Sequence, residues 1–417
     1  MFALVDANSF YCSAEQVFRP EWRGKPIIVL SNNDGCIVAA NKQAIALGVK
    51  KFYPFFKVKD LCERTGIIVC SSNYELYADL SHKMMQVIGR FAPSQHIYSI
   101  DESFLSFADC EHAIPDLALH AQAIRKAVWK ETRLPVCVGI GDTLTLAKVA
   151  NHVAKKWNGF NGVCVLDEKL KKDVFTQLSP SDVWGIGRKT NEKLKQNKIV
   201  TVEQLRKLDT RFLPKGFNVE LSRTINELNG IACKTWDGVR ADKLQIFSTR
   251  SMGKRIIDAQ NLNQALAKHA AIAAIKAREQ KSLCGTLMLF AANSPFDETP
   301  YSYKVIKQFA APTNDTSQIL KVISENMHHL YKSDVAYYRV GVGLLNLSSE
   351  THQQGDLFNP SKDNIKLMGA IDSINQRYGS CSLFFAAQGV DEPWSMRREL
   401  LTPQYTSNWR HLPKFTC

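Results

Sequence analysis

Apolar and polar positions alternate at the start of the chain, where Phe2, Leu4 and Asp6 share one face of a strand predicted over 1–10. Asn8 and Ser9 then break the alternation. Apolar runs and helical spacing predict further elements: strands at 98–107 and 136–140, and helices at 76–92, 113–133 and 144–156. The order predicts an α+β sheet domain, interrupted over 11–75 by a small, loop-rich insertion.

A glycine-bracketed turn follows at 184–187, between two short helical stretches. Backbone N–H groups at the start of a helix can hold a phosphate. The turn therefore predicts a helix-hairpin-helix that contacts a polyanion, and the residues that would make the contact are Gly185, Gly187, Arg188 and Lys189. An ordinary glycine turn between helices is the alternative.

Beyond residue 244 the pattern changes to the order β-α-β-β-α-β, with elements predicted at 246–256, 260–282, 284–292, 301–310, 315–331 and 336–347. This split βαβ order is typical of a small independent domain. From 349 onward the chain is polar, with one amphipathic helix candidate between Ile365 and Tyr378 and an aromatic-dotted end. We expect this tail to dock partner proteins.

Composition refines this picture for the 417 residues. The net charge is +13, and residues 185–285 carry twenty Lys or Arg against nine Asp or Glu. Such clustering is expected of a polyanion binder, although a solvated basic face would look the same. Eleven cysteines occur without a C-x-x-C motif, and no apolar run approaches the ~18 residues of a spanning helix. We expect about three domains and a cytoplasmic location.

Three acids in strand-like surroundings are the most informative residues. Asp101 and Glu102 are adjacent within the apolar run 97–104, and Asp6 lies in the first predicted strand. An ionised carboxylate is costly to bury alone, so these acids need a metal, arginines or a solvated strand end. A surface hairpin with acids at its tip is the plain alternative, and we favour the metal.

Hard oxygen ligands of this kind suit magnesium, which proteins usually hold through one or two carboxylates plus substrate phosphates. Two such ions, roughly 3.5–4 Å apart, polarise an α-phosphate and neutralise a leaving pyrophosphate. The three carboxylates leave part of the metal charge uncompensated, which a triphosphate would fill. The acids therefore predict a nucleotidyl-transfer site with two Mg²⁺ ions.

The chain resembles the Y-family DNA polymerases along its full length, through motifs at 1–6, 30–36, 72–79, 99–102, 146–148, 154–157 and 183–188. The resemblance implies an α+β right-hand polymerase fold. Its implied parts are a palm (1–10 and 76–165), small fingers (11–75), a helical thumb with the helix-hairpin-helix (166–233), a DNA-binding little finger (244–348) and a tail (349–417).

The resemblance also implies roles for single residues. Asp6, Asp101 and Glu102 match the palm carboxylates that bind two Mg²⁺ ions, and the main-chain carbonyl of Ala7 matches a further metal ligand. Tyr11 stands where the family keeps its steric gate, a rigid ring under the sugar that leaves no room for a 2′-hydroxyl. Simple core packing of Tyr11 is the alternative.

Nucleotide contacts carry over less completely. Lys155 matches the palm lysine that meets the triphosphate, with a solvated helix lysine as the rival interpretation. Val38 and Ala39 match the small roof over the nascent base pair. In the fingers, Lys42 stands where many members have tyrosine, and Ile45 where they have arginine or lysine. Ile45 cannot contact a phosphate by charge, so Lys42 would have to substitute for it.

The segment at 354–358 follows the last predicted strand and resembles the peptide by which bacterial polymerases bind the sliding clamp. Leu357 and Phe358 would be its apolar anchors, and Gln354 its polar one. The tail from 360 onward resembles the region that, in the family, engages a processed UmuD dimer and the RecA filament. Neither partner can be assigned to individual tail residues.

The resemblance thus implies a template-directed, error-prone DNA polymerase that copies damaged DNA by two-magnesium chemistry without proofreading. Its substrates would be primer-template DNA and dNTPs, in the cytoplasm and at the nucleoid when recruited. Two alternatives stay open. A palm-type nucleotidyl cyclase would share the acids but have no use for the basic surface, and a catalytically inactive scaffold would bind DNA or clamp only.

Overall fold

The structure is a computed structural model that describes residues 1–108, 110, 113–213, 216–235, 242–352 and 361–412. The chain forms two compact units. The first comprises residues 1–238 together with 399–417, and the second comprises residues 239–398. The tail is therefore shared between the two units.

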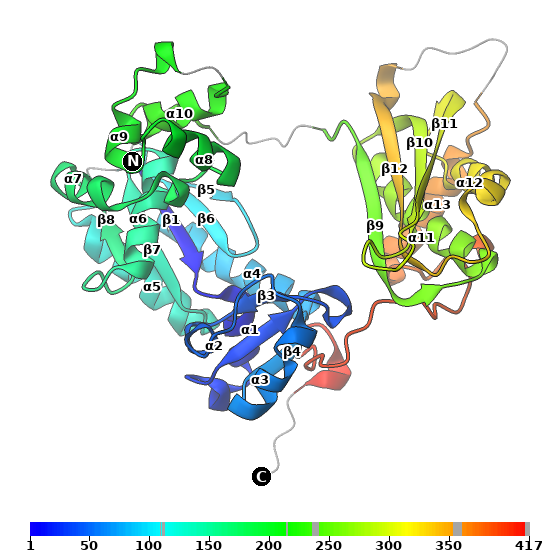
Figure 1. Cartoon of the computed structure of the whole chain (residues 1–417), viewed down its shortest axis with the longest axis horizontal. Helices are drawn as coiled ribbons and strands as arrows, with labels where there is room; N and C mark the ends of the chain where they lie inside the picture. The colour runs from blue at the N-terminus through cyan, green and yellow to red at the C-terminus, as the bar shows by residue number, and fades with distance from the viewer. Residues whose placement is uncertain (109, 111–112, 214–215, 236–241, 353–360, 413–417) are drawn as a thin grey trace. The chain divides into compact units, whose positions relative to one another are not determined.

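A five-stranded sheet in the order β5-β6-β1-β7-β8 forms the centre of the first unit (Figure 1). Its strands are β1 (Phe2–Ala7), β5 (Ser94–Ile97), β6 (Glu102–Ser106), β7 (Val136–Gly141) and β8 (Val163–Val165). β1 runs antiparallel to both β6 and β7, and its register places Asp6 opposite Glu102. Strand pairing thus makes neighbours of two acids that lie far apart in the sequence.

Helices cover both faces of this sheet: α4 (Tyr74–Ile88) and α5 (Leu117–Thr132) on one, α6 (Leu144–Lys156) on the other. Ala3 and Val5 point to the first face and Leu4 to the second, as the alternation predicts. α6 packs closely against β7 at Gly139. A Cβ at this position would overlap the backbone nitrogen of Asn151. The buried Asn151 amide donates to the carbonyls of Leu4, at 3.1 Å, and Cys137, at 3.0 Å.

The insertion after β1 forms a three-stranded sheet in the order β3-β2-β4. Its elements are α1 (Phe10–Val17), β2 (Ile27–Leu30), β3 (Ile37–Ala40), α2 (Lys42–Ala46), α3 (Lys59–Thr65) and β4 (Ile68–Ser71). The strand predicted over 1–10 was wrong at its end. β1 stops at Ala7, because Ser9 takes a left-handed conformation (φ 46°) and α1 begins at Phe10.

A helical cluster completes the first unit, with α7 (Glu168–Gln177), α8 (Arg188–Gln196), α9 (Val202–Arg206) and α10 (Val219–Leu228). It shares a hydrophobic core with α6. The element before the glycine turn is only a single 3-10 turn, Pro180–Asp182, and α8 follows the turn. The predicted pair of helices therefore begins with a turn rather than a full helix.

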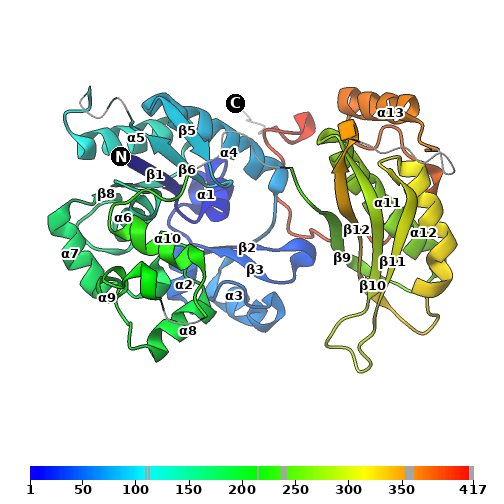
Figure 2. The ribbon, with the colours of Figure 1, turned by 90° about the horizontal axis from the view of Figure 1, so that it is seen from above.

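The second unit confirms the predicted β-α-β-β-α-β order: β9 (Ile246–Ile256), α11 (Ala259–Glu279), β10 (Ser282–Ala292), β11 (Ser302–Thr313), α12 (Thr316–Leu330) and β12 (Tyr337–Ser349). Its antiparallel sheet has the order β11-β10-β12-β9. α11 and α12 cover one face of this sheet (Figure 2). Among the described residues of this unit, the other face carries no helix.

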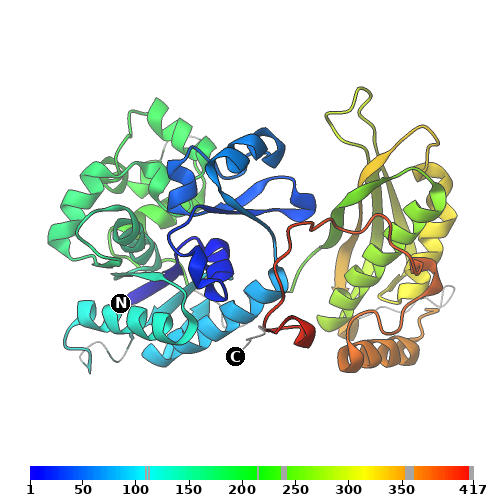
Figure 3. The same cartoon turned by 90° about the horizontal axis from the view of Figure 1, so that it is seen from below.

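The tail begins in the second unit and ends in the first. The predicted amphipathic helix is present as α13 (Ile365–Tyr378), which an ion pair between Arg278 and Asp372 joins to α11. From residue 399 the chain belongs to the first unit, where its red end lies beside α4 (Figure 3). In the part of the chain that the structure describes, we find no helix with the length and apolar character needed to cross a membrane.

Candidate active site

The three predicted acids lie together where β1 ends and β6 begins, at one end of the strands of the five-stranded sheet. Asp6 is near the end of β1, Glu102 begins β6 opposite it, and Asp101 precedes Glu102 in the turn. The N–H of Ala7 donates to the carbonyl of Asp101 at 2.9 Å, which fixes the turn against β1. The Ser99 hydroxyl donates to Asp101 Oδ1 at 2.6 Å and accepts from the N–H of Glu102 at 3.1 Å.

Two lysines on α6 reach this group of acids. Lys155 forms an ion pair with Asp6, and Lys148 Nζ lies 3.1 Å from both carboxylate oxygens of Glu102. Lys148, Asn151 and Lys155 follow one another at spacings of three and four residues, so they share one face of the helix. Because Asn151 is bonded to β1 and β7, that face points at the acids.

The positive charge near Asp6 does not fully compensate for the burial of its carboxylate. Burial raises the pKa of Asp6 to about 6, and the charges of Glu102 and Asp101 act in the same direction. The Lys155 ammonium opposes the rise in pKa without cancelling it. Any further cation close to Asp6 would therefore stabilise its ionised carboxylate.

The environment of Lys148 is aromatic as well as acidic. Its Nζ lies 4.4 Å from the ring centroid of Tyr98 and 5.1 Å from that of Trp184. Such contacts hold a lysine ammonium by attraction to the ring faces. We did not assign Lys148 a role from the sequence, although its seven-residue spacing from Lys155 on a predicted helix would have revealed it.

The donor set matches the ligands that magnesium prefers, namely carboxylate oxygens and a main-chain carbonyl. Among the described residues, however, no three His, Cys, Asp or Glu side chains converge on a shared metal position. Asp6 and Glu102 turn toward lysines, and Asp101 toward Ser99. The residues fit a divalent cation by donor type and by charge, with the lysines holding the carboxylates in this conformation.

Tyr11 lies on α1, half-buried, close to the same acids. Its ring stacks on that of Tyr77, with centroids 4.6 Å apart and planes 17° from parallel. It meets Tyr74 edge-on at 6.0 Å. Burial raises the pKa of Tyr11, and Tyr74 and Asp101 add to the rise. Tyr11 thus packs against the core with one ring face and stays near the acids.

A basic hollow of about 810 Å³ opens beside Lys155. Its charged lining is entirely cationic among the described residues: Lys42, Lys51, Arg125, Lys155 and Lys156. Lys51 was missed in the sequence, where nothing distinguished it from the neighbouring Lys50. Ile45 is 48% exposed and does not line the hollow.

The other predicted residues lie in β3, at the start of α8 or outside the described residues. Val38 and Ala39 are in β3, half-buried and buried. Gly185 has φ +90°, and Gly187 begins α8 without a side-chain cap. Arg188 and Lys189 are exposed in the first turn of α8. The clamp-type residues Gln354, Leu357 and Phe358 lie outside the described residues.

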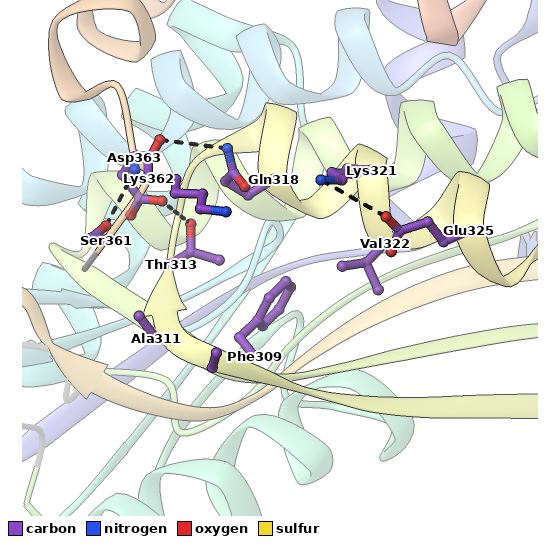
Figure 4. A pocket seen from close by; sticks show the side chains of 11 residues that line it. Phe309, Ala311, Thr313, Gln318, Lys321, Val322, Glu325, Ser361, Lys362 and Asp363 are labelled. Carbon is purple, nitrogen blue, oxygen red and sulfur yellow. Dashed lines mark hydrogen bonds and ion pairs between the residues drawn. The ribbon is translucent and has the colours of Figure 1, made fainter. Parts of the chain in front are cut away.

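The second unit has a hollow of about 350 Å³ between β11, α12 and the start of the tail (Figure 4). Its polar groups largely pair with one another. The Thr313 hydroxyl donates to Asp363 at 2.6 Å, and Lys321 lies 4.0 Å from Glu325. The hollow therefore joins the tail to the sheet and offers no cluster of reactive groups.

Family models match separate segments of the chain in the first unit, the second unit and the tail. The impB/mucB/samB family model matches residues 5–152, and the model of that family's C-terminal domain matches residues 243–357. Residues 365–414 match a domain of unknown function. Family likeness thus covers the acid site, the second unit and the tail.

Full-length relatives are also found. The chain is 38% identical over 419 residues to the protein UmuC of Salmonella typhimurium strain LT2, and 39% identical over 422 residues to the protein MucB of Escherichia coli. Both alignments cover 99% of each chain. DNA polymerase IV 1 of Bacillus subtilis is 25% identical over 90% of each chain.

Solved structures support the fold. A Y-family DNA polymerase chimera has a TM-score of 0.64 at 19% identity, over 84% of this chain and 100% of that one. The insertion ternary complex of Dbh DNA polymerase covers the same shares, with a TM-score of 0.55 at 19% identity. The α+β fold is thus that of a right-hand Y-family polymerase. The chain belongs to the impB/mucB/samB family and is a UmuC-like, Y-family DNA-directed DNA polymerase.

Proposed function

We propose that this polymerase performs translesion synthesis at the site formed by Asp6, Asp101 and Glu102. The observation that carries the proposal is the meeting of these acids with Lys155 at the edge of a basic hollow. Y-family polymerases are generally dependent on divalent metal. The acids and the Ala7 carbonyl would hold two Mg²⁺ ions, which when bound lower the pKa of the attacking hydroxyl and neutralise the leaving pyrophosphate.

The residues of the hollow would bind the triphosphate. Lys155 lies between Asp6 and the hollow, so its ammonium can neutralise a phosphate once the carboxylate has another cation. Lys42 and Lys51 contribute two more positive charges from the fingers. They would supply the charge that Ile45 lacks.

Tyr11 would exclude ribonucleotides, and the roof residues would tolerate damaged bases. The Tyr11 ring is rigid because it stacks on the fully buried Tyr77. A ring that cannot move rejects a 2′-hydroxyl by overlap. Val38 and Ala39 are small, so they would leave space over an altered template base.

DNA would be held mainly through phosphates, which position a duplex without selecting sequence. In the first unit, the uncapped start of α8 presents backbone N–H groups beside Arg188 and Lys189. In the second unit, the face without helices is flat at Gly341, where a Cβ would lie 2.7 Å from the ring of Phe290. Arg339 lies over that same ring, 5.8 Å from its centroid.

Recruitment would use the tail and the segment before it. We propose that Gln354, Leu357 and Phe358 bind a sliding clamp, and that a processed UmuD-type dimer and a RecA filament engage the tail. The support for the clamp contact is the sequence 354–358, and for the other partners the family likeness of the whole chain.

Primer extension on an abasic template tests the proposal. The purified chain, with Mg²⁺, dNTPs, clamp and partner proteins, should extend the primer past the lesion, and EDTA should stop it. A matched reaction with free triphosphate and no primer tests the cyclase alternative. Cyclic product there, or DNA binding without extension under every condition, would refute the proposal.

A further inference from the structure

The last described part of the tail, residues 399–412, lies against the first unit as an irregular segment with one 3-10 turn, Trp409–His411, and we call it the strap. Its beginning pairs with the end of β4: the N–H of Ser71 donates to the Leu400 carbonyl, and the N–H of Leu400 to the Ser71 hydroxyl, both at 2.9 Å. Asp34 accepts from Ser71 Oγ at 2.6 Å and from the N–H of Glu399 at 3.0 Å. The strap is therefore held by specific polar contacts.

The strap contacts residues 71–73, which connect the insertion to the five-stranded sheet domain. β4 ends at Ser71, and Asn73 caps the start of α4 through the N–H of Leu76. The buried Asn73 amide also donates to the carbonyl and the hydroxyl of Thr402, both at 3.0 Å. One side chain thus joins the start of α4 to the strap.

The strap also contacts the end of α1. The ring of Tyr405 stacks on that of Phe18, with centroids 4.7 Å apart, and its hydroxyl accepts from Arg19 Nε at 3.0 Å. Tyr405 is 8% exposed and belongs to the main core of this unit. α1 is the helix that carries Tyr11.

A buried carboxylate connects Thr402 with Tyr11. Glu15 is 2% exposed and accepts a hydrogen bond from the Tyr77 hydroxyl at 2.6 Å, and the side chain of Thr402 lies beside it. Tyr77 in turn stacks on Tyr11. Burial raises the pKa of Glu15, and the Tyr77 hydroxyl and the Thr402 side chain oppose the rise. The strap therefore places a polar side chain next to this carboxylate.

We propose that the strap is a specificity element of the polymerase, in which Thr402 positions Asn73 and the start of α4, with them Tyr77 and Glu15, and thereby sets the place of the Tyr11 ring. Thr402 and Glu15 are positioning residues, since both side chains are buried. The inference rests on the proposed role of Tyr11 as the sugar gate. A buried amide that loses an acceptor, or a buried carboxylate that loses a polar neighbour, must shift. Either change would disturb the ring that supports Tyr11.

The test uses the full chain and measures the ratio of ribonucleotide to deoxyribonucleotide incorporation on undamaged primer-template. Thr402→Val keeps the shape and removes the hydroxyl, so we expect ribonucleotide incorporation to rise about fivefold, the ratio that about 1 kcal/mol represents. Thr402→Ser restores the hydroxyl and should restore the ratio of the unmodified chain. Tyr77→Phe, which keeps the ring, provides a second variant with the same expected rise.

Two controls separate the possible failures. Tyr405→Phe removes the bond to Arg19 but keeps the stacked ring, so it should leave sugar discrimination unchanged. Tyr11→Ala should abolish most discrimination and sets the scale. If Tyr11→Ala changes nothing, the proposed gate itself fails. If Tyr11→Ala responds while Thr402→Val and Tyr77→Phe match the unmodified chain, or Thr402→Ser behaves like Thr402→Val, the role of the strap is refuted.

Discussion

The palm and the fingers place charged groups by different means. In the palm, Asp6 and Glu102 are paired residues of adjacent strands, and the lysines that meet them share one face of a helix bonded to the same sheet. In the fingers, Lys42 begins the five-residue helix α2, and Lys51 lies in a turn. Strand register fixes the palm acids, whereas short elements leave the proposed phosphate contacts of the fingers open to rearrangement.

The largest effect should come from the palm. Asp101→Asn keeps the size and the Ser99 contact but removes a charge, so primer extension should fall at least a thousandfold, about 4 kcal/mol of transition-state stabilisation. DNA binding, measured by fluorescence anisotropy, should remain. Residual synthesis within tenfold of the unmodified chain would exclude Asp101 from the catalytic site.

Lys155 should show the next largest effect, because it meets both an acid and the basic hollow. Lys155→Ala should raise the KM for dNTP by about 10- to 100-fold, as expected for a lost charge-assisted contact of about 1.5–3 kcal/mol. Lys169→Ala, an exposed lysine on α7, is the matched control. Equal behaviour of the two variants would make Lys155 an ordinary solvated lysine.

Substitutions of charged residues in the fingers should have smaller effects, and a cation at a second position should compensate for them. Lys51→Ala should raise the KM for dNTP about fivefold, and adding Ile45→Arg in the same chain should recover most of it, because a new cation would reach the same phosphates from α2. Steady-state kinetics on single-nucleotide insertion measures both. Failure of Ile45→Arg to compensate would show that the fingers, like the palm, depend on fixed positions.

The smallest effect should come from the start of α8. Combined replacement of Arg188 and Lys189 by alanine should weaken binding to all DNA sequences alike and lower the slope of log K against log salt by about one to two. Titrations at several salt concentrations measure the slope. A sequence-dependent loss would argue against phosphate contact.

The sequence predicted the convergence of Asp6, Asp101 and Glu102 and the element order of the second unit, because both follow strand and helix periodicity. It ended the first strand too late, although Asn8 and Ser9 break the alternation, because a serine does not mark a left-handed turn as a glycine would. Lys148 was visible in helical spacing and was overlooked. Lys51, Thr402 and Glu15 were not predictable, because their neighbours lie far away in sequence and no repeat marks them.

The route of the tail affects how truncated proteins should be interpreted. The second unit, residues 239–398, is inserted into the sequence of the first unit, so the chain continues into the first unit at both of its ends. A stop codon placed after residue 349 removes the proposed partner-binding segment and the strap together. The mutation spectrum of such a truncated protein would therefore combine failed recruitment with altered sugar choice. Point substitutions at Thr402 separate the two defects in a genetic assay.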